Sequence, residues 1–203
     1  LEFDNGKYLL INYGMSGNWR LDSHDLKHSM IKFHMNDANY HYCSIRRFGK
    51  VCYLTQADLQ SELAKIGPSI LDELLTKETV LQRWQFKRTN ICKLLLEQKY
   101  ISGIGNYLKS ESLYQCAIYP FAQVTDLSAD DLYDLYLAAR DIGRRAVEAG
   151  GATLYTYTGV KGDRSPFKST LKVYDQSHDP TGLPITKKET PNVVTLSGYP
   201  SKQ

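Results

Sequence analysis

Residues 103–106 hold the pattern in this chain that is best suited to binding chemistry: Gly103 and Gly105 stand two apart, and Asn106 follows directly. Glycine permits a positive φ and lets a ligand come close to the main chain. A helix-forming run begins at Asn106, and a helix start offers unpaired N–H groups and the positive end of the helix dipole. This glycine turn (residues 103–106) therefore indicates a phosphate site. Since Gly-x-Gly is common, a plain tight turn is the alternative.

Two further stretches are suited to contacting a nucleic acid. Residues 14–17 (Gly-Met-Ser-Gly) place Met15 at the end of an expected strand, where its thioether is a flexible apolar probe. Residues 46–49 (Arg-Arg-Phe-Gly) start with Arg46, which can hold a phosphate, and contain Phe48, which can wedge between bases. The simpler alternatives are a turn with Met15 packed inward and a solvated, charged strand edge.

The elements that must position these residues fall into three parts. Residues 1–55 show the turn signals and alternation of an antiparallel sheet, with strands expected at 8–11, 31–35, 40–45 and 51–54. Residues 57–149 show helical periodicity. Residues 152–203 return to short strands and loops, with a mobile surface loop at 156–168, a strand at 171–174 and a polar tail from Asp175.

The central part carries a series of helix signals. In chain order, helices are expected at 57–66, at 71–75, after the cap residue Asn90, from Asn106 to about residue 117, and at 129–149. The last is the best marked, because Ser128 and Asp131 form a capping-box pattern and apolar residues recur at spacings of three and four. Gly150-Gly151 ends it.

Composition excludes several classes of protein. The 203 residues carry a net charge of +3 and 42% hydrophobic residues, which suits a mildly basic chain of one large domain or two small ones. No apolar run approaches the about 18 residues of a membrane span. The four cysteines form no Cys-x-x-Cys pair, and the five histidines complete no zinc pattern, although His24 and His28 are four apart. We expect no metal, no cofactor and no membrane partner, reduced cysteines, and an intracellular monomer.

The three stretches occur in the order found in the formamidopyrimidine-DNA glycosylase/endonuclease VIII family, the helix–two-turn–helix DNA glycosylases, which the chain resembles over nearly all of residues 1–175. The other matching segments are residues 67–68, 86–89, 110–113, 150–154 and 171–174. The resemblance implies an α+β fold with three parts: the end of an antiparallel β-sandwich at 1–68, a helix–two-turn–helix domain at 69–151, and a lesion-loop and zincless-finger β-hairpin region at 152–203.

The resemblance also implies how a damaged site is recognised. The family flips a damaged nucleotide out of the duplex, and by position Met15, Arg46 and Phe48 match the residues that fill the hole left behind. The arginine can hydrogen-bond the orphaned opposite base. Residues 156–168 match a mobile loop that covers the flipped base.

Other residues match the family's contacts to the DNA backbone. Asn106 matches a phosphate-binding asparagine, with Gly103 and Gly105 shaping the turn before it, and Tyr174 matches a tyrosine that touches the backbone. Asn12 stands where the family often has a phosphate-binding histidine, and it can donate a hydrogen bond but carries no charge.

The activity that the resemblance implies is base-excision repair of double-stranded damaged DNA, in which a damaged base is removed and the abasic site is then cut by elimination. The family's catalytic residues are an N-terminal proline, a glutamate after it and a lysine, and this chain has none of them; Lys7 lies beyond the position of that lysine. We expect a chain that is shortened at its start and that binds damaged DNA without cutting it. No arginine follows Arg164, where the family has a fingertip arginine, which indicates an altered C-terminus.

Two other functions remain open at this level. A non-enzymatic nucleic-acid-binding protein with a helix–two-turn–helix needs neither Met15 nor the segment from Arg46 to Phe48. A binder of small phosphate ligands needs only the glycine turn, and it has no salt-dependent affinity for DNA.

Overall fold

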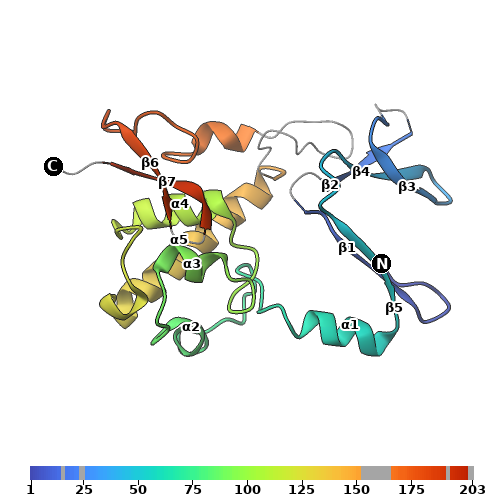
Figure 1. Cartoon of the computed structure of the whole chain (residues 1–203), viewed down its shortest axis with the longest axis horizontal. Coiled ribbons are helices and arrows are strands. Elements are labelled where there is room, and N and C mark those ends of the chain that lie inside the picture. The colour runs from blue at the N-terminus through green and yellow to red at the C-terminus, as the bar shows by residue number, and fades with distance from the viewer. Residues whose placement is uncertain (15–16, 23–25, 152–165, 191–192, 201–203) are drawn as a thin grey trace. The chain divides into compact units, whose positions relative to one another are not determined.

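The computed structural model describes residues 1–14, 17–22, 26–151, 166–190 and 193–200, and the chain forms two compact units (Figure 1). One unit contains Leu1–Ala64 and Val147–Ser169, and the other contains Lys65–Ala146 and Thr170–Gln203. Strands dominate the first unit, whereas the second combines helices with a hairpin. The predicted α+β fold is confirmed.

The first unit contains two small antiparallel sheets. β1 (Tyr8–Asn12) pairs with β5 (Lys50–Leu54), and β4 (Asn39–Ser44) lies between β2 (Gly17–Leu21) and β3 (Ser29–His34). The sequence predicts all of these strands except β2, because β2 starts inside the glycine-rich stretch, where the turn signal dominates.

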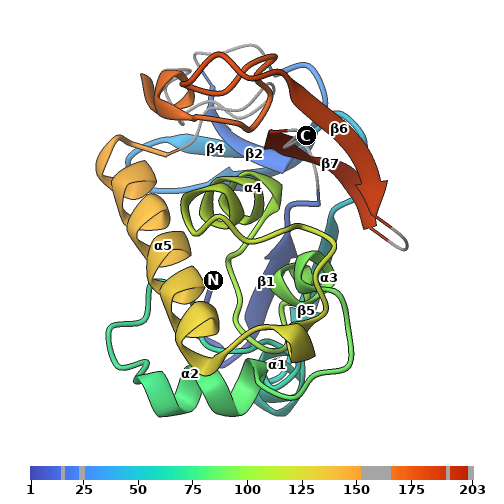
Figure 2. The same ribbon diagram turned by 90° about the vertical axis from the view of Figure 1, so that its left-hand side faces the viewer.

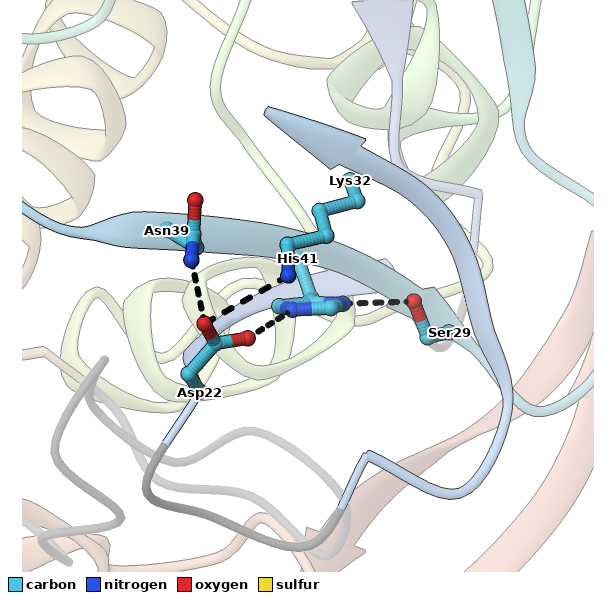
Figure 3. A network of polar contacts seen from close by, with 5 residues as sticks. All are labelled: Asp22, Ser29, Lys32, Asn39 and His41. Atoms are coloured by element: carbon cyan, nitrogen blue, oxygen red, sulfur yellow. Dashed lines mark hydrogen bonds and ion pairs between the residues drawn. The ribbon is translucent and has the colours of Figure 1, made fainter. Parts of the chain in front are cut away.

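A polar network ties the strands of the β2–β4–β3 sheet together (Figure 3). The carboxylate of Asp22, just after β2, accepts hydrogen bonds from Asn39 and from His41 Nε2, both on β4. It also pairs with Lys32 Nζ of β3 at 3.5 Å, and the other ring nitrogen of His41 contacts Ser29 Oγ at 2.8 Å. The hydrogen bonds from Asn39 and His41 lower the pKa of Asp22, which keeps the carboxylate ionised at neutral pH. The network therefore supports the pairing of the three strands.

The helix that follows the sheets begins with a capping box. Thr55 accepts a hydrogen bond from the Asp58 N–H through its side chain, and the Asp58 carboxylate accepts one from the Thr55 N–H. The resulting helix, α1 (Gln56–Leu63), starts one residue earlier and ends three residues earlier than the sequence predicts.

The helices of the second unit are α2 (Lys77–Trp84), α3 (Ile91–Leu96), α4 (Asn106–Gln115), the short 3-10 helix η1 (Val124–Asp126) and α5 (Ala129–Glu148), whose end belongs to the first unit. The predicted capping box of α5 is confirmed, since Ser128 Oγ accepts from the Asp131 N–H at 3.1 Å. Its apolar stripe is buried as predicted. α5 passes α4 at Gly143, where an added Cβ would lie 3.3 Å from Leu71 and in ordinary contact, at 3.8 Å, with Leu108 of α4 (Figure 2).

The short helix predicted at residues 71–75 is wrong. These residues form turns, in which Ser69 Oγ accepts from the Leu71 N–H and Asp72 Oδ1 accepts from the Leu74 N–H. Such side chains compete with the helical hydrogen-bond pattern. The helix begins later, after the cap Thr76, and buries Trp84 against Tyr136 of α5.

The strand predicted at residues 171–174 is also wrong. In place of a partner strand, the N–H groups of Lys172, Val173 and Tyr174 donate to one carboxylate, that of Glu111 on α4. The expected finger region does contain a hairpin, because β6 (Ile185–Thr190) and β7 (Val193–Pro200) pair antiparallel. The loop predicted at 156–168 lies outside the described residues up to residue 165, and its end belongs to the 3-10 helix η2 (Pro166–Thr170).

Two further observations concern membrane spans and the cysteines. None of the helices in the described ranges is both long enough and apolar enough to cross a bilayer. The four cysteines all lie in described segments and form no disulfide, with Cys43 and Cys92 buried.

Candidate nucleic-acid interface

The glycine turn connects the middle helices of the second unit and leaves the start of α4 accessible. Gly103 has φ +90°, a conformation that favours glycine, and a Cβ there would lie 3.2 Å from Ile70. Gly105 is the N-cap of α4 in an extended conformation, and no side chain caps the helix. An added Cβ at Gly105 meets nothing within 4 Å. The backbone at this helix start is therefore open to a ligand.

Gln98 braces the glycine turn from within. Its Nε2 donates to the carbonyls of Leu96 and Ile104 at 3.0 and 2.9 Å, and its Oε1 accepts from the Gly103 N–H at 2.8 Å. One amide side chain thus fixes both sides of the turn. Sequence reasoning missed Gln98, because a glutamine between two helices has no recognisable spacing with its partners.

Asn106, the first residue of α4, is partly exposed and has a buried partner. Its Oδ1 accepts a hydrogen bond from Lys109 Nζ at 3.2 Å, and the Lys109 side chain is fully buried. Burial lowers the pKa of Lys109, because the low-dielectric surroundings disfavour the ammonium form. The predicted phosphate contact thus stands beside a cationic group that the sequence analysis did not single out.

Glu111 brings Tyr174 to the same helix. The Glu111 side chain is buried and accepts from the N–H groups of Lys172, Val173 and Tyr174 at 2.9, 2.8 and 2.7 Å. The Tyr174 ring packs edge-on against the ring of Tyr107, and the two ring centroids are 6.4 Å apart. Tyr174 therefore lies next to the residue that follows Asn106, and two of the predicted backbone contacts belong to one cluster.

In the first unit, the two predicted recognition loops lie back to back. Gly14 has φ +58°, and a Cβ there would lie 2.8 Å from the carbonyl carbon of Phe48. Asn12 Oδ1 accepts from the Gly14 N–H at 2.8 Å, which closes the turn. A Cβ at Gly49 would collide with the Tyr42 hydroxyl and would lie 2.6 Å from the Asn12 carbonyl oxygen. Both glycines are required by the close approach of the loops.

The loop at residues 45–49 presents its large side chains to solvent. Phe48 is 69% exposed and Ile45 is 55% exposed, while Arg46 is also on the surface. Arg47 has φ +54°, which marks a tight turn just before Phe48. Met15 lies outside the described residues. Phe48 and Ile45 therefore give this loop an apolar surface that is available for contact.

The second unit also has an acidic cavity, which is unsuited to binding DNA. The cavity measures about 460 Å³ and is lined by Cys116 and by Asp131, Asp134 and Asp141. Burial, with the charges of Asp134 and Asp131, raises the pKa of the Cys116 thiol to about 11. The carboxylates repel phosphates and the thiol is protonated at neutral pH. Within the described segments, no cluster of three or more His, Cys, Asp or Glu side chains is arranged to hold a metal ion.

Comparison with known proteins defines the class of this chain. Residues 66–158 match the model of the H2TH domain of formamidopyrimidine-DNA glycosylase, the segment that contains the glycine turn and Asn106. The formamidopyrimidine-DNA glycosylase of Thermomicrobium roseum is 32% identical, over 91% of this chain and 69% of its own length. The chain therefore belongs to the formamidopyrimidine-DNA glycosylase family.

Solved structures carry the same fold. The MutM (Fpg) protein of Thermus thermophilus is similar with a TM-score of 0.83 and 25% identity, over 92% of this chain and 72% of that one. A Lactococcus lactis Fpg mutant, solved in complex with DNA containing Fapy-dG, also has a TM-score of 0.83, at 22% identity over 95% of this chain and 73% of its own.

Proposed function

We propose that the protein serves base-excision repair as a DNA glycosylase with lyase activity at abasic sites, and that these 203 residues provide its grip on damaged duplex DNA. The observation that carries the proposal is the uncapped start of α4 behind an open glycine turn, in a segment that matches the family's H2TH domain. In this proposal, the protein acts on DNA inside the cell.

The second unit supplies the hold on the DNA backbone in this proposal. A phosphate placed at Gly105 and Asn106 accepts hydrogen bonds from the N–H groups of the first turn of α4 and faces the positive end of the helix dipole. Asn106 Nδ2 has no hydrogen-bond partner among the described residues, so it is available as a further donor. Tyr174, next to Tyr107, extends the contact along the backbone.

The first unit supplies the inspection of the duplex. In this proposal Phe48, together with Met15 by its position in the sequence, takes the space that a flipped nucleotide leaves, while Arg46 contacts the opposite strand. Asn12 shapes the turn before Met15 through its bond to the Gly14 N–H, so its role is structural in the free protein. These residue roles extend the family's scheme to this chain.

A gel-shift assay with abasic, intact and RNA duplexes at two salt concentrations tests the function. About two or three phosphate contacts predict an affinity for abasic DNA that falls about 10- to 40-fold between about 50 and about 200 mM salt. Abasic DNA is expected to bind more tightly than intact DNA, and RNA more weakly than either. Equal affinity for all three duplexes would point to a non-specific nucleic-acid binder. No salt-dependent affinity for any duplex would instead favour a binder of small phosphate ligands.

Replacing Phe48 by alanine is expected to lower the preference for abasic over intact DNA by about fivefold or more, because a wedged ring is worth on the order of 1–3 kcal/mol of stacking. Affinity for intact DNA and the melting temperature should change little, since the ring is 69% exposed. Tyr53→Ala is the matched control, an exposed aromatic on β5 of the same unit. An equal loss on both duplexes would count against the wedge.

A further inference from the structure

A buried lysine lies beneath the glycine turn. Lys109 lies one turn after Asn106 on α4, and its side chain has no exposed surface. Long side chains on a helix point back toward its N-terminus, which brings the Lys109 ammonium to the start of α4. A cation at the positive end of a helix is unfavourable, and its burial adds a desolvation cost. A group that the fold keeps at such a cost points to function.

The contact between Lys109 and Asn106 fixes the orientation of the asparagine amide. An ammonium group has donors and no acceptor, so the amide atom that faces it must be the oxygen. The 3.2 Å contact between Nζ and Oδ1 therefore turns the Asn106 N–H2 away from the protein interior. Without the ammonium, the amide can rotate and present its oxygen outward, where it repels a phosphate.

We propose that Lys109 is a positioning residue for DNA binding: its buried ammonium holds the Asn106 side chain with the N–H2 aimed at a backbone phosphate at the start of α4. The inference rests on the proposed function and adds to it a residue that acts through Asn106. It also explains the buried charge, because a phosphate bound at this helix start offsets the unfavourable potential around the ammonium.

The test replaces Lys109 by methionine, which keeps the length of the side chain but has no N–H donor. Affinity for abasic and intact duplexes is expected to fall by the same factor, about tenfold. The melting temperature is measured alongside, so that a loss of folding is told apart from a loss of binding. Lys109→Gln, whose amide can still donate to Asn106, is expected to recover part of the affinity. It also keeps the test valid if the methionine variant fails to fold.

A double-mutant cycle separates positioning from a general effect. In an Asn106→Ala background, Lys109→Met should have little further effect, whereas in a Phe48→Ala background its tenfold effect should remain. The inference is overturned if Lys109→Met binds DNA as tightly as the parent, or if its effect is unchanged when Asn106 is absent. A parent chain without affinity for DNA would instead refute the proposed function itself, so the two failures are distinguishable.

Discussion

Asn106→Ala is expected to weaken binding to intact and abasic duplexes equally, by about 10- to 100-fold, because it removes a hydrogen bond to a charged phosphate. The loss does not depend on the lesion, since a backbone phosphate carries no sequence or damage information. Fluorescence anisotropy titrations with both duplexes measure it. Asn106→Asp sharpens the result: the carboxylate keeps an oxygen for Lys109 but has no N–H donor and adds a negative charge, so the loss should be larger still.

The control for this prediction lies on the same helix. Gln115 is exposed at the C-terminal end of α4, and Gln115→Ala should leave both affinities unchanged. A loss confined to the abasic duplex would mean that Asn106 reads the damage and not the backbone. An unchanged affinity in Asn106→Asp would remove Asn106 from the interface altogether.

Glu111→Gln is expected to lower the free energy of unfolding by about 2–4 kcal/mol, the largest effect on stability expected from any of these variants. The two carboxylate oxygens accept from the N–H groups of residues 172–174. A glutamine amide has one oxygen, and its N–H2 would face a backbone N–H, which leaves buried donors unsatisfied. Urea unfolding measures the change.

Glu148→Gln serves as the matched control, because Glu148 is exposed at the end of α5 and surface substitutions change stability by about 0.5 kcal/mol or less. Glu111→Gln should also reduce DNA affinity, since the same hydrogen bonds hold the backbone of Tyr174. A variant as stable as the parent would show that the carboxylate contributes nothing beyond what an amide supplies.

Local signals predicted the parts of this fold that depend on neighbouring residues. The capping box of α5, its buried stripe and the start of α4 after Gly105 are all set within a few positions of the chain, and the structure contains them. The strands β1, β3, β4 and β5 could be predicted from the sequence for the same reason. The order of three short motifs then sufficed to indicate the family.

Long-range partners account for what the sequence did not reveal. Residues 171–174 have the composition of a strand, but their N–H groups meet a carboxylate from a helix about sixty positions earlier, which no local pattern encodes. The contacts of Gln98 and Lys109 form only in the folded turn, so the neighbouring sequence does not identify these two residues. The helix predicted at residues 71–75 failed for a local reason, because Ser69 and Asp72 compete for the N–H groups that a helix needs.

The close approach of Gly14 and Gly49 has a consequence for how such a protein changes over time. Because the backbone at Gly14 and at Gly49 lies against the other loop, a side chain at either position would push the two loops apart. We therefore expect variation in the range of recognised damage to come from exchanging other residues of these segments while both glycines are kept. A library that randomises Met15, Arg46 and Phe48 while keeping both glycines samples the changes that this architecture tolerates.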